Sequence, residues 1–284
     1  MRAGNAELYV GPAGWSYKDW EGIVYPQPKP RGFRPPQYLS RWFNTIELNN
    51  TFYRPPSAAH CARWVGDVDG RPGFLYTAKL WQRFTHERDG AWTDDEVRAF
   101  HDGIEPLREA GRLGALLMQF PWSFRYGARS EEHLKRLVGE FGDLPLVLEV
   151  RHRGWLQDQA LRAVESLGVG FCNIDQPAFP SNLPLTSIAF GPVGYLRLHG
   201  RNVETWFAEG AGRDQRYDYL YKPAELDQVE AALRELADRV ERLFVIANNH
   251  YRGQAVAAGL QVLQRFGHET DPPPGRVGEL YGIP

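Results

Sequence analysis

The sequence predicts an α/β protein with a single domain, a (β/α)8 TIM-type barrel that takes in residues 1–284. Short apolar runs alternate with amphipathic stretches along nearly the whole chain. Strands that alternate with helices pair in parallel through right-handed crossovers. Eight such units within 284 residues favour a closed barrel. No repeat, low-complexity tract or linker divides the sequence.

The strands are predicted from apolar runs of strand length. In chain order they are 8–12, 45–51, 74–80, 113–120, 146–151, 169–174, 194–199 and 243–248. Most intervals between them have helical periodicity. Thr93 and Glu96 form a capping-box pattern ahead of an apolar stripe that ends at Leu107, and Pro223 begins a second stripe that ends at Val240. Similar stretches are 130–141, 156–167 and 252–266.

One interval breaks the alternation. Residues 176–190, after the sixth predicted strand, contain three prolines and no apolar stripe. We therefore expect the sixth helix of the barrel to be missing or replaced by coil.

The composition limits the classes of function. Hydrophobic residues make up 43% and charged residues 24%, and the formal net charge is −2, which disfavours a globally basic nucleic-acid binder. Cys61 and Cys172 are far apart without a CxxC pattern, so neither a disulfide scaffold nor a zinc site is indicated. The start has no signal-peptide pattern and no apolar run is long enough to span a membrane, so a cytoplasmic protein without membrane association is expected.

Polar side chains collect where the predicted strands end. Alternate residues of a barrel strand face the lumen, and active sites of such barrels lie at the C-terminal ends of the strands. By this period of two, Glu47 shares a face with Asn49, and Glu149 shares a face with Arg151. The seventh strand and the residues after it supply Arg197, His199 and Arg201, and four other strands end at Lys79, Gln119, Asp175 and Asn248. These residues predict a ligand site at the mouth of the barrel.

Glu47, Glu149 and Asp175 give three acids, and Lys79, Arg151 and Arg197 give three cations, with His199 in addition, so the charges of these residues are balanced. A divalent metal is usually held by an excess of carboxylate and His ligands, so neither a metal nor another cofactor is expected. Arg and Lys suit an anionic group, and carboxylates suit hydroxyls. The leading hypothesis is an enzyme that acts by acid–base chemistry on an anionic or phosphorylated sugar-like substrate. The candidate catalytic residues are Glu47, Glu149 and His199. The candidate substrate-binding residues are Trp15, Tyr17, Asn49, Lys79, Gln119, Arg151, Asp175, Arg197, Arg201 and Asn248.

A purely structural role is the competing interpretation of these charges. Glu149 with Arg151, or Glu47 with Lys79, would then be structural ion pairs. Arg197 is expected to matter more for anion binding than for folding. Aromatic residues in 14–26 and aromatic and Arg residues in 199–223, among them Trp206, Phe207 and Arg213, either stack on sugars or bases or pack a small core of their own.

An ordered series of motifs resembles the YecE-like family, known as domain of unknown function 72, over about residues 9–265. The resemblance implies a TIM-type barrel with a loose relation to sugar-isomerase-like and endonuclease-like barrels, and it implies no established activity. The motifs are GPAGWSYKDWEGIVYP, FNTIELNNTFYRPP, FLYTAKLWQRFTH, LLMQFPWSF, LEVRHRGW, YLRLHGR, YDYLYKPAEL and IANNHYRGQAV.

Two alternative functions remain open. One is a metal-dependent phosphodiesterase, endonuclease-like or sugar-isomerase-like barrel with Glu149, Asp175 and His199 as ligands. The other is a non-catalytic protein that binds a nucleotide or nucleic acid through the aromatic and Arg residues of the loops, although nucleic acid is the less favoured partner. The sequence predicts no oligomeric state.

Overall fold

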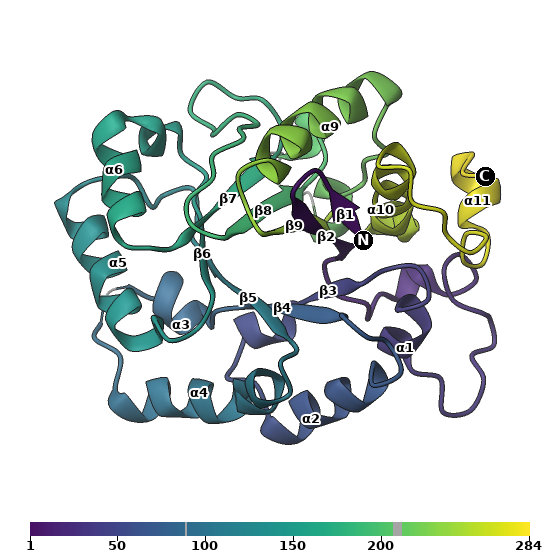
Figure 1. Cartoon of the computed structure of the whole chain (residues 1–284), viewed down its shortest axis with the longest axis horizontal. Helices are drawn as coiled ribbons and strands as arrows, with labels where there is room; N and C mark the ends of the chain where they lie inside the picture. Colours follow the sequence, from purple (N-terminus) through teal and green to yellow (C-terminus); the bar gives the residue numbers. More distant parts are fainter. Residues whose placement is uncertain (89, 207–211) are drawn as a thin grey trace.

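A computed structural model of the chain describes residues 1–88, 90–206 and 212–284, and it confirms the predicted fold class (Figure 1). One curled sheet of nine strands has the order β1-β2-β9-β8-β7-β6-β5-β4-β3. The strands are β1 Arg2–Ala3, β2 Ala6–Pro12, β3 Thr45–Leu48, β4 Leu75–Lys79, β5 Leu113–Gln119, β6 Leu146–Glu149, β7 Gly170–Asp175, β8 Val193–Leu198 and β9 Arg242–Ala247.

All eight predicted strands are present, as β2 to β9. Each adjacent pair from β3 through β9, and the pair of β9 with β2, is parallel. The short β1, which the sequence did not predict, is antiparallel to β2 with Arg2 opposite Glu7. It extends the sheet without entering the barrel.

The barrel closes where β2 meets β3, and a short backbone bridge and the Asn44 side chain replace a regular ladder at this seam. Ala13 forms a parallel bridge with Glu47, and the Gly14 N–H donates to the Glu47 carbonyl at 2.9 Å. Further down, Asn44 accepts a hydrogen bond from the Val10 N–H at 2.9 Å and donates Nδ2 to the Leu8 carbonyl at 2.8 Å. The seam therefore brings the upper ends of β2 and β3 together at the mouth.

Helices cover the outside of the sheet (Figure 1). The α-helices are α1 Pro35–Leu39, α2 Ala58–Asp67, α3 Gln82–Thr85, α4 Asp94–Glu109, α5 Ala128–Phe141, α6 Asp158–Ser166, α7 Val203–Trp206, α8 Arg213–Arg216, α9 Pro223–Ala237, α10 Gln254–Arg265 and α11 Val277–Tyr281. The short 3-10 helices are η1 Lys18–Trp20, η2 Asn50–Phe52, η3 Arg153–Leu156 and η4 Tyr251–Gly253.

The local sequence explains where α4 begins and why no helix follows β7. At the start of α4, the Thr93 hydroxyl accepts from the Glu96 N–H and the Glu96 carboxylate accepts from the Thr93 N–H, which completes the predicted capping box. Between β7 and β8, every residue of 176–192 is described and none is helical. The sixth helix is therefore replaced by coil, as the prolines predict.

Candidate functional site

A fully buried charge network lies across the upper part of the barrel. The Arg197 guanidinium, 1% exposed, donates Nη2 to Glu47 Oε1 and Nη1 to Glu149 Oε2, each at 2.7 Å. Both carboxylates are 0% exposed. Residues from β3, β6 and β8 are thus joined through one side chain. The two charge-assisted hydrogen bonds fix the orientation of the guanidinium plane.

Arg151 and His199 extend this network toward the mouth. Arg151 donates Nε and Nη2 to Glu149 Oε1 at 3.1 and 2.9 Å, and His199 Nε2 lies 3.6 Å from the same oxygen. Burial alone would raise the pKa of Glu149, but the charges of Arg197 and Arg151 outweigh it and hold that pKa well below its ordinary range. Burial also lowers the pKa of His199 to about 3, so its imidazole is neutral at pH 7.

Tyr195, which the sequence analysis missed, supports the network from below. Its hydroxyl lies 2.9 Å from Glu47 Oε2 and 2.9 Å from Thr77 Oγ1. Tyr195 is two residues before Arg197 on β8, so the same period of two that selected Arg197 also predicts an inward Tyr195. The signal was present in the sequence, but a rule based on charged residues does not select a tyrosine.

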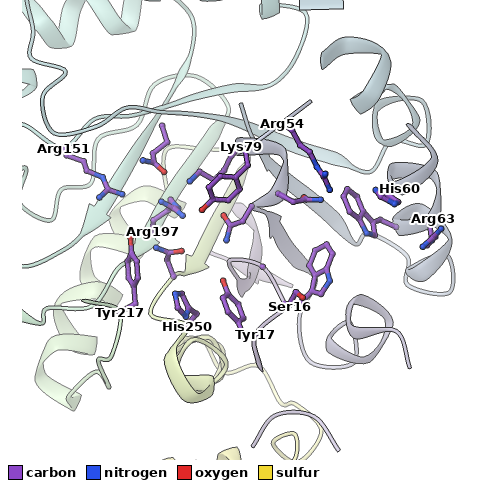
Figure 2. A pocket seen from close by; sticks show the side chains of 18 residues that line it. Ser16, Tyr17, Arg54, His60, Arg63, Lys79, Arg151, Arg197, Tyr217 and His250 are labelled. Carbon is purple, nitrogen blue, oxygen red and sulfur yellow. The ribbon is translucent and has the colours of Figure 1, made fainter. Parts of the chain in front are cut away.

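A cavity of about 540 Å³ opens above the network at the C-terminal ends of the strands (Figure 2). Five of its lining side chains are cationic, and none of the described lining residues is Asp or Glu. In Figure 2, Arg151 and Arg197 lie toward one end, His60 and Arg63 toward the other, and Lys79 between them. The lining residues are Gly14, Trp15, Ser16, Tyr17, Asn49, Asn50, Tyr53, Arg54, His60, Arg63, Trp64, Lys79, Gln119, Arg151, Arg197, Tyr217, Asn248 and His250.

Lys79 is the last residue of β4 and reaches into this cavity with 9% of its surface exposed. Thr51 fixes its backbone, because the threonine hydroxyl donates to the Lys79 carbonyl at 2.7 Å. The ammonium nitrogen lies 4.2 Å from the centroid of the Phe52 ring. Burial, reinforced by the nearby Arg197 charge, lowers the pKa of Lys79 to about 7.

This lowered pKa predicts that stability rises with pH above neutrality. Between about pH 7 and 10.5 the unfolded chain keeps the Lys79 proton while the folded protein releases it, so raising the pH disfavours unfolding. Replacing Lys79 by Met should remove up to about 1.4 kcal/mol of this rise per pH unit. Urea unfolding at a series of pH values from about 7 to 9.5 measures the slope. Lys18→Met, at an exposed position, is the control, and equal slopes for both variants would refute the assignment.

The structure places the thirteen predicted site residues in three groups. Eight of the thirteen line the cavity: Trp15, Tyr17, Asn49, Lys79, Gln119, Arg151, Arg197 and Asn248. Glu47, Glu149 and His199 are buried beneath it. Asp175 and Arg201 form neither part of the lining nor part of the network around Arg197.

The prediction that put Asp175 and Arg201 in the mouth is corrected by their contacts. Arg201 donates to both carboxylate oxygens of Asp175 at 2.8 to 3.0 Å, and the Tyr221 hydroxyl donates to Asp175 at 2.7 Å. Arg201 also donates to Gln228 of α9 at 2.8 Å. The pair therefore joins the sheet to the helix layer. On β7 it is Cys172 that faces the lumen, and its thiol is buried beside Glu149 and Arg197.

The expectation for Arg197 also changes, because its two partners are fully buried carboxylates. Removal of Arg197 would leave both without a cation, so the residue matters for folding as well as lining the cavity.

Sequence reasoning missed the rim of the cavity on the side of α2. Arg54 precedes this helix, and His60, Arg63 and Trp64 share one face of it. That spacing of three and four residues was a readable signal, but the helix itself was not predicted. The loop before α2 packs tightly on α4, where a Cβ on Gly103 would lie 2.0 Å from the Pro56 carbonyl.

Aromatic rings form the remaining wall. Tyr17 stacks on His250 with ring centroids 4.4 Å apart. The ring of Tyr217 is tilted against His250, and their centroids are 5.3 Å apart. Of the aromatic and Arg residues expected to act in 199–223, Phe207 lies outside the described residues, and so do the side chains of Trp206 and Arg213.

The described part of the chain contains no group of three or more His, Cys, Asp or Glu side chains arranged to hold a metal ion. None of its helices combines the length and apolar character needed to cross a membrane.

The fold and the cavity define a TIM-type barrel protein with a cationic pocket at the C-terminal mouth. The chain belongs to the family described as "Protein of unknown function DUF72", whose model matches residues 9–277. It is 29% identical to UPF0759 protein YunF of Bacillus subtilis (strain 168), over 90% of this chain and 94% of that protein.

Solved structures of the same family are similar throughout. A DUF72 family protein from Thermotoga maritima MSB8 is 33% identical with a TM-score of 0.79, covering 92% of this chain and 99% of its own. A DUF72 family protein from Enterococcus faecalis V583 is 23% identical with a TM-score of 0.81. The match covers 93% of this chain and 97% of that protein. This confirms the family that the motifs indicated.

Proposed function

We propose that the mouth of the barrel binds an anionic, sugar-like molecule and that the protein is an enzyme acting on it by acid–base chemistry. The observation that carries the proposal is the lining of the cavity, with five cationic side chains and no carboxylate among its described residues. The two nearest carboxylates, Glu47 and Glu149, are buried below and already neutralised by Arg197 and Arg151. Arg54, Arg63 and the protonated fraction of Lys79 have no ion pair with a carboxylate among the described residues, and this excess of positive charge favours an anion.

The polar and aromatic groups suit the rest of such a molecule. Asn49, Gln119 and Asn248 offer amide donors and acceptors for hydroxyl groups. Trp15 and Tyr17 offer flat apolar faces for the carbon skeleton of a sugar. A cavity of about 540 Å³ is in the usual range for a small-molecule site.

The proton-transfer group that fits best is Lys79 rather than Glu149 or His199. An effective acid or base has a pKa close to the working pH, and the pKa of Lys79 is about 7. Glu149 has a pKa well below its ordinary range and His199 a pKa of about 3, so neither exchanges a proton readily near neutrality. We propose that Glu47, Glu149 and His199 hold Arg197 and Arg151 in position.

The test is a thermal-shift titration with ribose 5-phosphate, ribose and inorganic phosphate. We expect the phosphate compounds to raise Tm and ribose to have little effect, with smaller shifts at high salt because ions screen the attraction. The double variant Arg54→Met/Arg63→Met removes two exposed cations without leaving a buried charge. It should weaken phosphate binding by about ten-fold, which corresponds to about 1.4 kcal/mol.

Arg162→Met is the matched control, since Arg162 is exposed on α6 and does not line the cavity. If the wild-type protein shows no phosphate-dependent stabilisation, or if the double variant keeps all of it, the anion site is wrong.

One observation favours a second candidate, a nucleotide or single-stranded nucleic acid. Trp15 and Trp64 meet edge to face at the cavity with centroids 5.6 Å apart, and Arg63 lines the cavity beside Trp64. Aromatic rings next to Arg can stack bases. A larger thermal shift with a mononucleotide or a short oligothymidylate than with ribose 5-phosphate would move this function ahead.

A further inference from the structure

Lys79 differs from the other cations of the pocket, because Arg151 and Arg197 bond to carboxylates and Arg54 and Arg63 are exposed. Within residues 1–88, 90–206 and 212–284, its ammonium makes no hydrogen bond or ion pair with a carboxylate, and its closest described partner is the face of Phe52. Glu47 and Glu149 act on it at longer range, but both are already bonded to guanidinium groups. Its positive charge is therefore poorly compensated.

Burial favours the neutral amine, and the charges of Arg197 and Arg151 add to this effect while those of Glu47 and Glu149 oppose it. Several elements contribute groups that act on Lys79 or contact it, and the two guanidinium groups among them stay charged near neutrality. The groups are Glu47 of β3, Phe52 of η2, His86 after α3, Glu149 of β6, Arg151 after β6 and Arg197 of β8. A lysine that is desolvated and placed beside fixed cations is the arrangement that activates an amine as a nucleophile. The lowered pKa agrees with this geometry.

We propose that Lys79 is a covalent nucleophile that forms an imine with the carbonyl group of an open-chain, anionic sugar-like substrate. This inference rests on the proposed anion-binding function of the same cavity, replaces the proton-transfer role of Lys79 with a covalent one, and names the substrate class. Guanidinium groups lie on both sides of Lys79 in the cavity (Figure 2). They are placed to hold the anionic group while the carbonyl carbon meets the amine.

The step balances without a further reactant. The amine nitrogen of Lys79 adds to the carbonyl carbon, and the carbonyl oxygen becomes a hydroxyl group. The nitrogen gives up two protons to that oxygen in total, water leaves, and a C=N bond remains. No oxidation or reduction occurs. The imine, once protonated, draws electrons from the neighbouring carbon and makes its proton easier to remove, which is the chemistry of sugar isomerisation and carbon–carbon cleavage.

The chain supplies its own control. It contains five lysines, Lys18, Lys29, Lys79, Lys135 and Lys222, and the four besides Lys79 are exposed. Reaction at Lys79 can therefore be compared with reaction at four reference amines in the same molecule.

The experiment is reductive trapping of the full chain at pH 7 with glyceraldehyde 3-phosphate or glyceraldehyde, followed by sodium borohydride. Peptide mass spectrometry then gives the extent of modification at each lysine. We expect Lys79 to be modified about ten-fold or more faster than the mean of the other four, because about half of it is neutral at that pH. The phosphorylated aldehyde should favour Lys79 more than glyceraldehyde does. Lys79→Arg, which keeps the charge, should lose this modification and leave the other four unchanged.

Thermal shift with glyceraldehyde 3-phosphate in the same samples separates the two proposals. Equal or absent modification of Lys79, together with stabilisation by the phosphate compound, overturns the imine and leaves the anion site standing. Absence of both overturns both. If Lys79→Arg does not fold, the peptide map of the wild-type protein still decides the question.

Discussion

Replacing Arg197 by Met should lower the free energy of unfolding by about 3–5 kcal/mol, or prevent folding altogether. The guanidinium is 1% exposed and donates to Glu47 and Glu149, each 0% exposed, at 2.7 Å. Without it, Glu47 has no remaining ion pair in the described structure, and Glu149 keeps only Arg151 and the neutral His199. Breaking a buried pair by removing one partner has a cost of this size because the other charge stays buried. Urea unfolding measures the change.

The control separates lost charge from lost packing. Arg197→Met combined with Glu47→Gln and Glu149→Gln removes the stranded charges and should recover a large part of the stability, because well-packed neutral replacements of buried ion pairs are often tolerated. Arg162→Met, exposed on α6, should change stability by less than about 0.5 kcal/mol. A single variant Arg197→Met within about 1 kcal/mol of wild type would show that the network is not structural.

Gly11→Ala should destabilise the protein by about 3 kcal/mol by forcing open the seam of the barrel. A Cβ on Gly11 would lie 1.8 Å from the carbonyl oxygen of Thr45, which belongs to the backbone of β3 and cannot rotate away. Overpacking of a tight site typically costs 1–3 kcal/mol, or more when backbone must move. The same strands hold Gly14 and Glu47 at the mouth, so anion binding should weaken as well. Urea unfolding and the phosphate titration give the two readouts.

Gly139→Ala is the matched glycine control. Gly139 lies in α5, and an added Cβ would meet no described atom within 4 Å. Alanine there should raise stability by about 0.5–1 kcal/mol, since glycine is a poor residue for a helix interior. If the two substitutions had equal effects, the β2–β3 contact at Gly11 would not be as tight as described.

Much of the fold could be predicted from the sequence, because its signals are local. The apolar runs marked all eight barrel strands, and the Thr93–Glu96 pattern marked the start of α4. The predicted end of β3 at residue 51 was wrong. The strand stops at Leu48, and Asn50–Phe52 forms a 3-10 turn, since Asn residues favour turns over ladders.

The site could be predicted only in part, because the rest depends on tertiary contacts between residues that are distant in the sequence. The period of two put Glu47, Glu149 and Arg197 on the lumen side, but the sequence could not show that Arg197 bonds both carboxylates. It also could not show which acid faces outward, and Asp175 turned out to pair with Arg201 beside α9. The rim cations Arg54 and Arg63 come from a loop and a helix, to which a rule about strand ends does not apply.

The most direct measurement is a crystal structure of the wild-type protein grown with ribose 5-phosphate. We expect the phosphate group inside the cavity, within hydrogen-bond distance of Arg54, Arg63 or Arg151, and the sugar carbons between Lys79 and the aromatic wall. A phosphate group bound outside the cavity, or a cavity that stays without the sugar phosphate at saturating concentration, would contradict the central claim that this mouth is an anion site.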